Sequence, residues 1–235
     1  MDFLLQVGQW LLNPAHWQGT DGIPNRLGEH IGMSVAATGT GAAFALPVGI
    51  LLGHWGRFGG LAVNISNVGR AIPSFAILVI ALQLFHIGAA PAYAALVLLA
   101  IPPMLTNSYV ALREVDRDVK DAARGMGYRE HVQLFQVELP LALPLIMAGV
   151  RTSAVQVVAT ATLAAVVAWG GLGRFIIDGL AQRDYVQLFS GALLVTGLAI
   201  LTEVGLATIE SALEPAGLRS LRAASARQAP ALERA

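Results

Sequence analysis

The chain contains no cysteine, and this absence excludes a disulfide framework, a thiolate metal site and a cysteine nucleophile. Charged residues are scarce as well: they make up 13% of the 235 residues, whereas 55% are hydrophobic. The mean hydropathy is +0.63, and the 15 basic and 15 acidic residues give a formal net charge of zero. No global field therefore favours nucleic acid, and so apolar a composition is typical of a protein whose solvent is the bilayer.

Two kinds of functional motif are also missing. The sequence has no Walker-type loop, GxxxxGK[ST], so the chain does not itself hold ATP in that way. It has no cluster of His, Asp and Glu with metal-ligand spacing, which disfavours a metal site and a membrane-embedded enzyme. The histidines are scattered at His16, His30, His54, His86 and His131. The absence of an internal repeat weakens, but does not exclude, an ion-coupled secondary transporter or a channel that works alone.

Long apolar runs predict the membrane spans, because a spanning helix needs about 20 mostly apolar residues. Such runs lie at 30–53, 61–86, 90–112, 141–168 and 187–210. The second run contains Asn64, Asn67 and Arg70 and then Pro73 within "GRAIPS", so it is either one span or two shorter pieces. We therefore predict an all-α, polytopic membrane protein with about five to six transmembrane helices.

The basic residues predict the orientation, because short cytoplasmic loops retain Lys and Arg. Residues 113–138 hold five basic and six acidic side chains, and the tail at 213–235 is rich in arginine. Both regions are predicted to be cytoplasmic, which agrees with the two spans between them and places the N-terminus outside. The N-terminal segment 1–29 is predicted to begin with a short helix lying in the membrane interface and ended by Asn13 and Pro14.

The charged insert at 113–138 is too polar to enter lipid, so we expect a structured cytoplasmic element. Ala122, Ala123 and Met126 form an apolar helical stripe, and a second helix is predicted to follow and to end before Pro140. Two short helices with an apolar ridge suit the groove of a partner protein. The same pattern also fits interfacial helices or a solvated loop.

The stretch "DAARGMGYREHVQLFQVELP", residues 121 to 140, resembles the signature of ABC-type importer permeases. That signature has Glu-Ala-Ala, then Gly after three residues, and after nine more an aliphatic residue, one further residue, Leu and Pro. The matching positions are Asp121, Ala122, Ala123, Gly127, Val137, Leu139 and Pro140. Asp121 replaces the usual Glu and keeps the charge with a shorter reach.

In that family the two short helices are coupling helices that insert into a cleft of the ATPase subunit. The resemblance therefore implies a type I ABC importer transmembrane-domain fold over residues 30–212, with a coupling loop at 113–138. It implies a transport subunit that is no enzyme and has no cofactor of its own, because ATP and Mg bind to a partner ATPase. Further partners implied are a second permease copy or homologue and an extracytoplasmic substrate-binding protein, in the bacterial cytoplasmic (inner) membrane.

Three other stretches, "GRAIPSFAIL", "LLAIPPMLTNSYVALREVD" and "QVVATATLAAVVAWGGLGRFI", resemble the osmoprotectant branch of these permeases. That branch imports quaternary amines such as glycine betaine, choline and carnitine. The alternative that stays open is a related importer for methionine or another amino acid or zwitterion.

Two sets of residues are candidates for the translocation path. Arg151 and Glu203 are the ionisable residues deepest in the predicted spans, and they could pair, either as a structural ion pair or in transport. A quaternary ammonium is usually held by aromatic faces, which makes Phe75, Tyr109 and Trp169 candidates for lining a passage. The alternative for tryptophans is an anchoring role at the membrane interface.

Two glycine positions predict tight turns. Gly127 is expected to need a positive φ between the two short helices, so that a Val there would distort the second helix. The "WGGLG" at 169–173 is predicted to form a tight bend at the outer end, either as part of a gate or as a flexible connection.

Overall fold

The computed structural model describes residues 2–56 and 59–213, and these residues form helices and no strand, which confirms the all-α class. The α-helices are α1 (Asp2–Leu12), α2 (Ile23–Trp55), α3 (Gly59–Ala71), α4 (Ser74–Phe85), α5 (Ala89–Glu114), α6 (Arg117–Gly125), α7 (Glu130–Gln133), α8 (Leu139–Thr160), α9 (Gly173–Gln182) and α10 (Tyr185–Leu213). The 3-10 helices are η1 (Pro14–Trp17) and η3 (Ala161–Val167), and η2 (Leu134–Glu138) is a π-helix. Of the predicted arginine-rich tail at 213–235, all but residue 213 lies outside the described residues.

Within the described residues, four helical stretches are long and apolar enough to cross a membrane by length and composition: Ile23–Trp55, Ala89–Glu114, Glu130–Val167 and Tyr185–Leu213. The run predicted at 61–86 is two pieces, α3 and α4, separated at Pro73. Proline has no N–H and disfavours a helical conformation in the residue before it, so α3 stops at Ala71. The two-piece alternative is therefore confirmed. The first span is longer than predicted, because α2 begins at Ile23.

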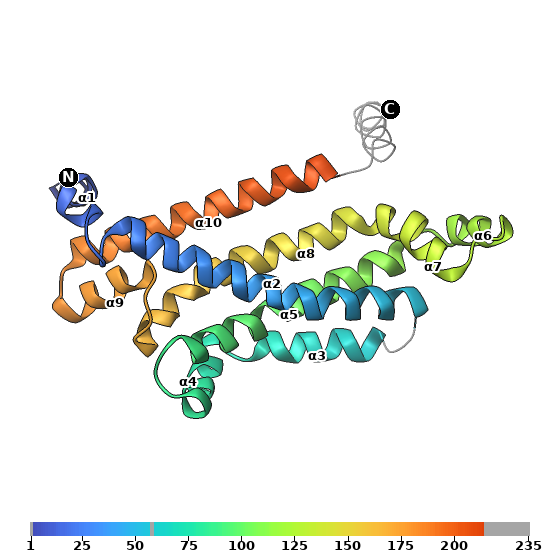
Figure 1. Ribbon diagram of the computed structural model, residues 1–235, viewed down its shortest axis with the longest axis horizontal. Coiled ribbons are helices and arrows are strands. Elements are labelled where there is room, and N and C mark those ends of the chain that lie inside the picture. Colours follow the sequence, from blue (N-terminus) through green and yellow to red (C-terminus); the bar gives the residue numbers. More distant parts are fainter. Residues whose placement is uncertain (1, 57–58, 214–235) are drawn as a thin grey trace, which may run out of the picture.

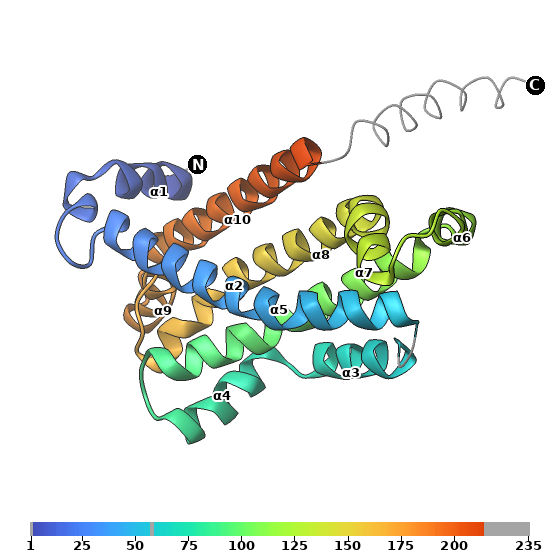
Figure 2. The same ribbon diagram turned by 45° about the vertical axis from the view of Figure 1, so that its right-hand side comes forward.

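The long helices α2, α5 and α8 run side by side along the longest axis of the molecule (Figure 1). Helices α3 and α4 pack against α5 on one side, and α10 packs against α8 on the other (Figure 2). The short helices α6 and α7 lie at one end of the bundle, and α1 and α9 lie at the opposite end. The charged insert is thus held at one end of the spanning helices.

A seam of small residues joins α2 to α5. Gly41, Gly49 and Gly53 are buried on α2 at spacings that are multiples of four, which puts them on one face. A Cβ added at Gly41 would lie 2.7 Å from the Cβ of Ala100, and one added at Gly53 would lie 2.7 Å from the Cβ of Leu112. Glycine therefore allows the two backbones to approach closely, as small residues do in membrane proteins.

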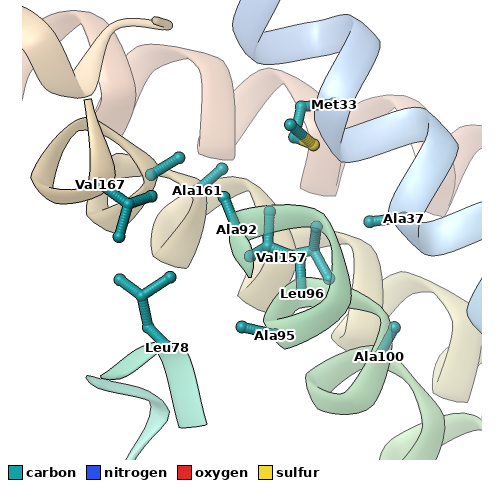
Figure 3. Packing of buried hydrophobic residues seen from close by; sticks show 11 residues of the cluster. Met33, Ala37, Leu78, Ala92, Ala95, Leu96, Ala100, Val157, Ala161 and Val167 are labelled. Carbon is teal, nitrogen blue, oxygen red and sulfur yellow. The ribbon is translucent and has the colours of Figure 1, made fainter. Parts of the chain in front are cut away.

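The largest apolar cluster lies toward the end of the bundle opposite α6 and α7 and joins α2, α4, α5, α8 and η3 (Figure 3). Its buried members are Met33, Ala37, Leu78, Ala92, Ala95, Leu96, Ala100, Val157, Ala161, Ala164 and Val167. Alanine is the commonest residue among them, so these helices also pack at short distances.

The predicted end of the second short helix is wrong. Instead of stopping before Pro140, the helix continues from Glu130 through η2 into α8. Proline normally leaves the carbonyl four residues back without a partner, but the bonds in η2 span five residues, as when the Leu139 N–H donates to the Leu134 carbonyl. This wider turn accommodates the proline inside a continuous helix.

Candidate functional site

The coupling segment, residues 113–138, forms two helices separated by a glycine turn, as predicted. The carboxylate of Asp116 begins α6 by accepting the N–H of Asp118 at 2.9 Å. Gly127 follows α6 with φ +83°, so the expected positive φ is confirmed. Nothing lies within 4 Å of a Cβ added there, so a substitution would be strained by its backbone and not by crowding.

The signature residues divide between the surface and the interior of this segment. Asp121 and Ala122 are exposed, and Asp121 pairs with Arg124 at 3.2 Å. Ala123 is buried, whereas the later positions are half-buried at Val137, Leu139 and Pro140. The first positions can thus meet a partner, and the others hold the segment to the bundle.

An apolar ridge lies on the outside of the coupling segment. Met126 is 68% exposed and Phe135 is 66% exposed, and Tyr128 between them is also exposed. Large apolar side chains exposed beside charged ones on short helices suit the groove of a partner protein. The structure therefore presents both the signature residues and an apolar ridge at the same end of the bundle.

A buried carboxylate holds the inner side of the segment. Glu138 is 1% exposed, and its Oε1 accepts a hydrogen bond from Gln133 Nε2 at 2.7 Å. Its Oε2 lies 2.9 Å from Nδ1 of His54 and 3.6 Å from Nζ of Lys120. The Lys120 ammonium also donates to the Leu112 carbonyl at the end of α5, at 2.7 Å. We call Glu138, Gln133, His54 and Lys120 the Glu138 hub, which joins α2, α5, α6 and the helix that becomes α8.

Sequence reasoning missed the Glu138 hub. Two signals were present: Glu138 stands in the otherwise uncharged "VQLFQVELPLALP", and Lys120 is the only lysine in the chain. The partner His54 is distant in sequence, and only the packing of α2 against the other helices brings it to the carboxylate.

The predicted pair in the spans is confirmed. Arg151 on α8 lies 3.1 Å from Glu203 on α10, measured from Nη1 to Oε1. Its Nε also lies 3.5 Å from Oε2 of Glu210, a second partner that the sequence analysis did not name. Glu203 and Glu210 are seven residues apart, which places them on one face of α10. The arrangement is a cluster of one cation and two carboxylates.

The three aromatic candidates do not come together in one chain. Phe75 is half exposed near the start of α4, and Trp169 packs against the largest apolar cluster, at the end opposite α6 and α7. Tyr109 lies on α5 beside Gly59 at the start of α3, near the coupling end. Within the described residues, these three rings form no common aromatic cage.

The predicted bend at 169–173 is present and is fastened to α2. Gly171 has φ +83°, and its N–H donates to Glu29 Oε2 at 2.7 Å. The Leu172 N–H lies 3.3 Å from Nδ1 of His30, whose Nε2 lies 2.9 Å from the Val158 carbonyl. This end of the bundle is therefore tied together by polar contacts as well.

Comparisons with known proteins agree with this geometry. The family model described as "Binding-protein-dependent transport system inner membrane component" matches residues 45–214. The chain is 38% identical to a choline transport system permease protein of Bacillus subtilis (strain 168) over 194 residues, which cover 83% of this chain and 89% of that protein. It is 34% identical to a glycine betaine/carnitine/choline transport system permease protein of the same strain over 200 residues, covering 85% and 92%.

A carnitine transport permease protein of Listeria monocytogenes is 37% identical over 194 residues, covering 83% of this chain and 89% of that protein. Among solved structures, an inward-facing form of the MetNI methionine ABC transporter matches with a TM-score of 0.74. It is 23% identical and covers 86% of this chain and 99% of that one. At 23% identity, this similarity shows the fold alone.

Proposed function

The chain belongs to the family of binding-protein-dependent transport system inner membrane components, and from this premise we propose that it imports quaternary-ammonium compatible solutes such as glycine betaine, choline and carnitine. As a member of that family it is a permease subunit of an ABC transporter, a transport component and not an enzyme. The single observation that carries the substrate class is the 34–38% identity, over more than four fifths of the chain, to three permeases named for these solutes.

The coupling segment is the proposed docking site for the ATPase, which would bind ATP and Mg. Its exposed apolar ridge, the signature residue Asp121 and the glycine turn at Gly127 support this assignment. Docking there places this end of the bundle in the cytoplasm. Two crossings after the coupling segment then leave the C-terminus cytoplasmic, and three crossings before it, with α3 and α4 counted as one, leave the N-terminus outside.

A second permease copy and an extracytoplasmic binding protein complete the proposed transporter. We place the second copy against the open face of α10. Glu203 is half exposed there, although it lies on a helix apolar enough to span the membrane. A carboxylate facing lipid is costly, whereas one facing a protein partner or a water-filled path is not.

The translocation path would run beside this face and include Arg151 and Glu203. The aromatic residues Phe75, Tyr109 and Trp169 can contribute to the path from separate levels. Contacts of this kind are weak, which lets the substrate leave.

Uptake of radiolabelled glycine betaine and of choline tests the substrate class. Cells at high osmolarity are compared with and without the gene, and loss of ATP-dependent uptake in the deletion is the expected result. Unchanged uptake of both solutes would overturn the substrate assignment, and the same assay with methionine would then test the alternative importer.

Docking of the ATPase is tested by a pair of glycine variants. Gly127→Val forces a β-branched residue into a positive φ, which costs about 1–3 kcal/mol locally, and it should reduce both ATPase co-purification and uptake. Gly125→Val is the matched control, because Gly125 has no positive φ and nothing within 4 Å of an added Cβ. Asp121→Ala should weaken docking as well. If the ATPase co-purifies with Gly127→Val and Asp121→Ala as well as it does with the wild type and with the Gly125→Val control, the docking assignment is wrong.

A further inference from the structure

We infer that Glu138 is a positioning residue that makes the coupling segment move as one body with α2, α5 and α8. This inference rests on the proposed coupling role of residues 113–138. The Glu138 hub contacts all of these elements directly: His54 belongs to α2, Lys120 to α6 and Gln133 to α7, and the Leu112 carbonyl belongs to α5.

The π-helical turn brings Glu138 into contact with Gln133. Residues five apart in an α-helix point about 140° apart around its axis, because each residue turns the chain by about 100°. In η2 the wider turn brings the side chains of Gln133 and Glu138 within 2.7 Å. The irregular backbone at the start of α8 therefore has a specific result, which is a buried carboxylate with donors on several sides.

A lysine suits position 120 of the Glu138 hub. All other basic side chains in the chain, apart from histidine, are arginine, and Lys120 is the single exception. Its side chain is 12% exposed, and its compact ammonium reaches both the Leu112 carbonyl and Glu138. A guanidinium is larger and holds its donors in a rigid planar fork instead of at one point, so arginine is not a conservative replacement here.

The hub also adjoins a tightly packed part of the α2–α5 seam. His54 follows Gly53, where an added Cβ would lie 2.7 Å from Leu112 Cβ and 2.8 Å from the Tyr109 carbonyl oxygen. Residues packed this closely cannot slide past each other without separating. A displacement of α6 by the ATPase is therefore passed through Lys120 and Glu138 to His54, and from there to α2 and α5 together.

The unique lysine supplies a readout that requires no substrate. The purified permease–ATPase complex is treated with N-hydroxysuccinimidyl acetate, without nucleotide and with ATP, and acetylation of Lys120 is followed by mass spectrometry against the denatured chain. Protection of Lys120 in both states is expected for the wild type. Glu138→Gln should raise the acetylation rate about tenfold or more, because a buried cation without its counter-ion is strongly disfavoured.

Coupling is measured as glycine betaine or choline taken up per ATP hydrolysed in proteoliposomes. Glu138→Gln should lower this ratio about tenfold while ATP hydrolysis continues, since the ATPase still docks on the exposed ridge. His54→Leu keeps the Lys120 contact and should lower the same ratio with Lys120 still protected. Asp2→Asn, an equal loss of charge at an exposed position of α1, should change neither readout.

A purely structural role would lower the amount of complex and leave the ratio of the surviving complex unchanged, which would overturn the inference. So would free acetylation of Lys120 in the wild type, or wild-type ratios in both Glu138→Gln and His54→Leu. If the wild type takes up neither solute, the substrate assignment fails, and Lys120 protection alone decides the inference. If Gly127→Val and Asp121→Ala leave ATPase co-purification at the wild-type level, the docking assignment fails and the inference that rests on it fails too. If docking is lost in Gly127→Val but Glu138→Gln and His54→Leu keep the wild-type ratio, the inference alone fails.

Discussion

Helices α5 and α10 are both long and apolar enough to span a membrane, yet they are surrounded very differently. Helix α5 has buried residues from Pro91 to Leu112, where α2, α3, α4 and α8 pack against it, whereas α10 buries only Ser190, Gly191 and Val195, all in its first half. A groove of about 590 Å³ lies open between α2, α8 and α10, which all line it. Hydropathy therefore identifies a spanning helix but does not tell whether the helix lies at the centre of one chain or faces a partner.

The two ionic clusters differ in the same way. Glu138 is 1% exposed beside the α2–α5 seam, whereas Arg151 on α8 and Glu203 on α10 are 28% and 47% exposed. Removing one partner from a buried charge pair leaves an uncompensated charge, whereas an open pair contributes little. We expect substitutions on the α5 side of the molecule to have the larger effects.

Lys120→Met gives the largest expected effect. It leaves the buried Glu138 without its cation and should lower the free energy of unfolding by about 3 kcal/mol or more. Thermal unfolding of the purified complex measures this loss. Arg124→Met on the same helix removes an ion pair whose side chains are 65% and 69% exposed, and it should cost about 1 kcal/mol or less. Equal losses would remove the contrast between buried and open pairs.

Gly49→Ala and Gly39→Ala compare the two faces of α2. A Cβ at Gly49 would lie 2.7 Å from the Leu105 carbonyl oxygen of α5, so overpacking should destabilise the protein by about 1–3 kcal/mol. Gly39 faces the groove toward α10 and has nothing within 4 Å of an added Cβ, so alanine there should be neutral or stabilise the helix by up to about 1 kcal/mol. Chemical denaturation of both variants, purified side by side, measures the change in the free energy of unfolding. The two changes should have opposite signs or clearly different sizes.

Arg151→Met has the smallest expected effect, about 1 kcal/mol or less, because in the proposed transporter its partners line a water-filled path. Arg151→Glu should be worse, since three carboxylates would then lie together. Adding Glu203→Arg should restore only part of the loss, because Glu210 also lies 3.5 Å from the side chain at position 151. Measured melting temperatures that the swap restores completely would show that Glu210 takes no part in the cluster.

The sequence predicts the spanning helices well because each is a local apolar run. The turn at Gly127 and the break at Pro73 are local as well, since they depend on the backbone preferences of glycine and proline. The continuation of the helix past Pro140 could not be predicted, because proline ordinarily ends a helix and the π-helical turn that accommodates it has no simple pattern.

The charged residues show the same limit. Arg151 and Glu203 stand out because each interrupts an apolar span, so their pairing could be predicted. Glu138 and His54 are joined only after α2 has packed against α5, because the two residues are 84 positions apart in the chain. Long-range packing of this kind is what the local pattern of a sequence does not contain.

The end of α3, just before the break at Pro73, lies beside the prolines of α5. A Cβ added at Gly69, near the end of α3, would lie 3.4 Å from Cγ of Pro102, halfway along α5. Pro102 and Pro103 leave the carbonyls of Leu98 and Leu99 without a helical donor, and the first amides of α4 have no helical acceptor. Polar backbone groups at bilayer depth draw water toward them. The membrane-spanning part of the bundle should therefore contain a hydrated layer near its middle. Backbone amides at this level should exchange with deuterium sooner than those on either side.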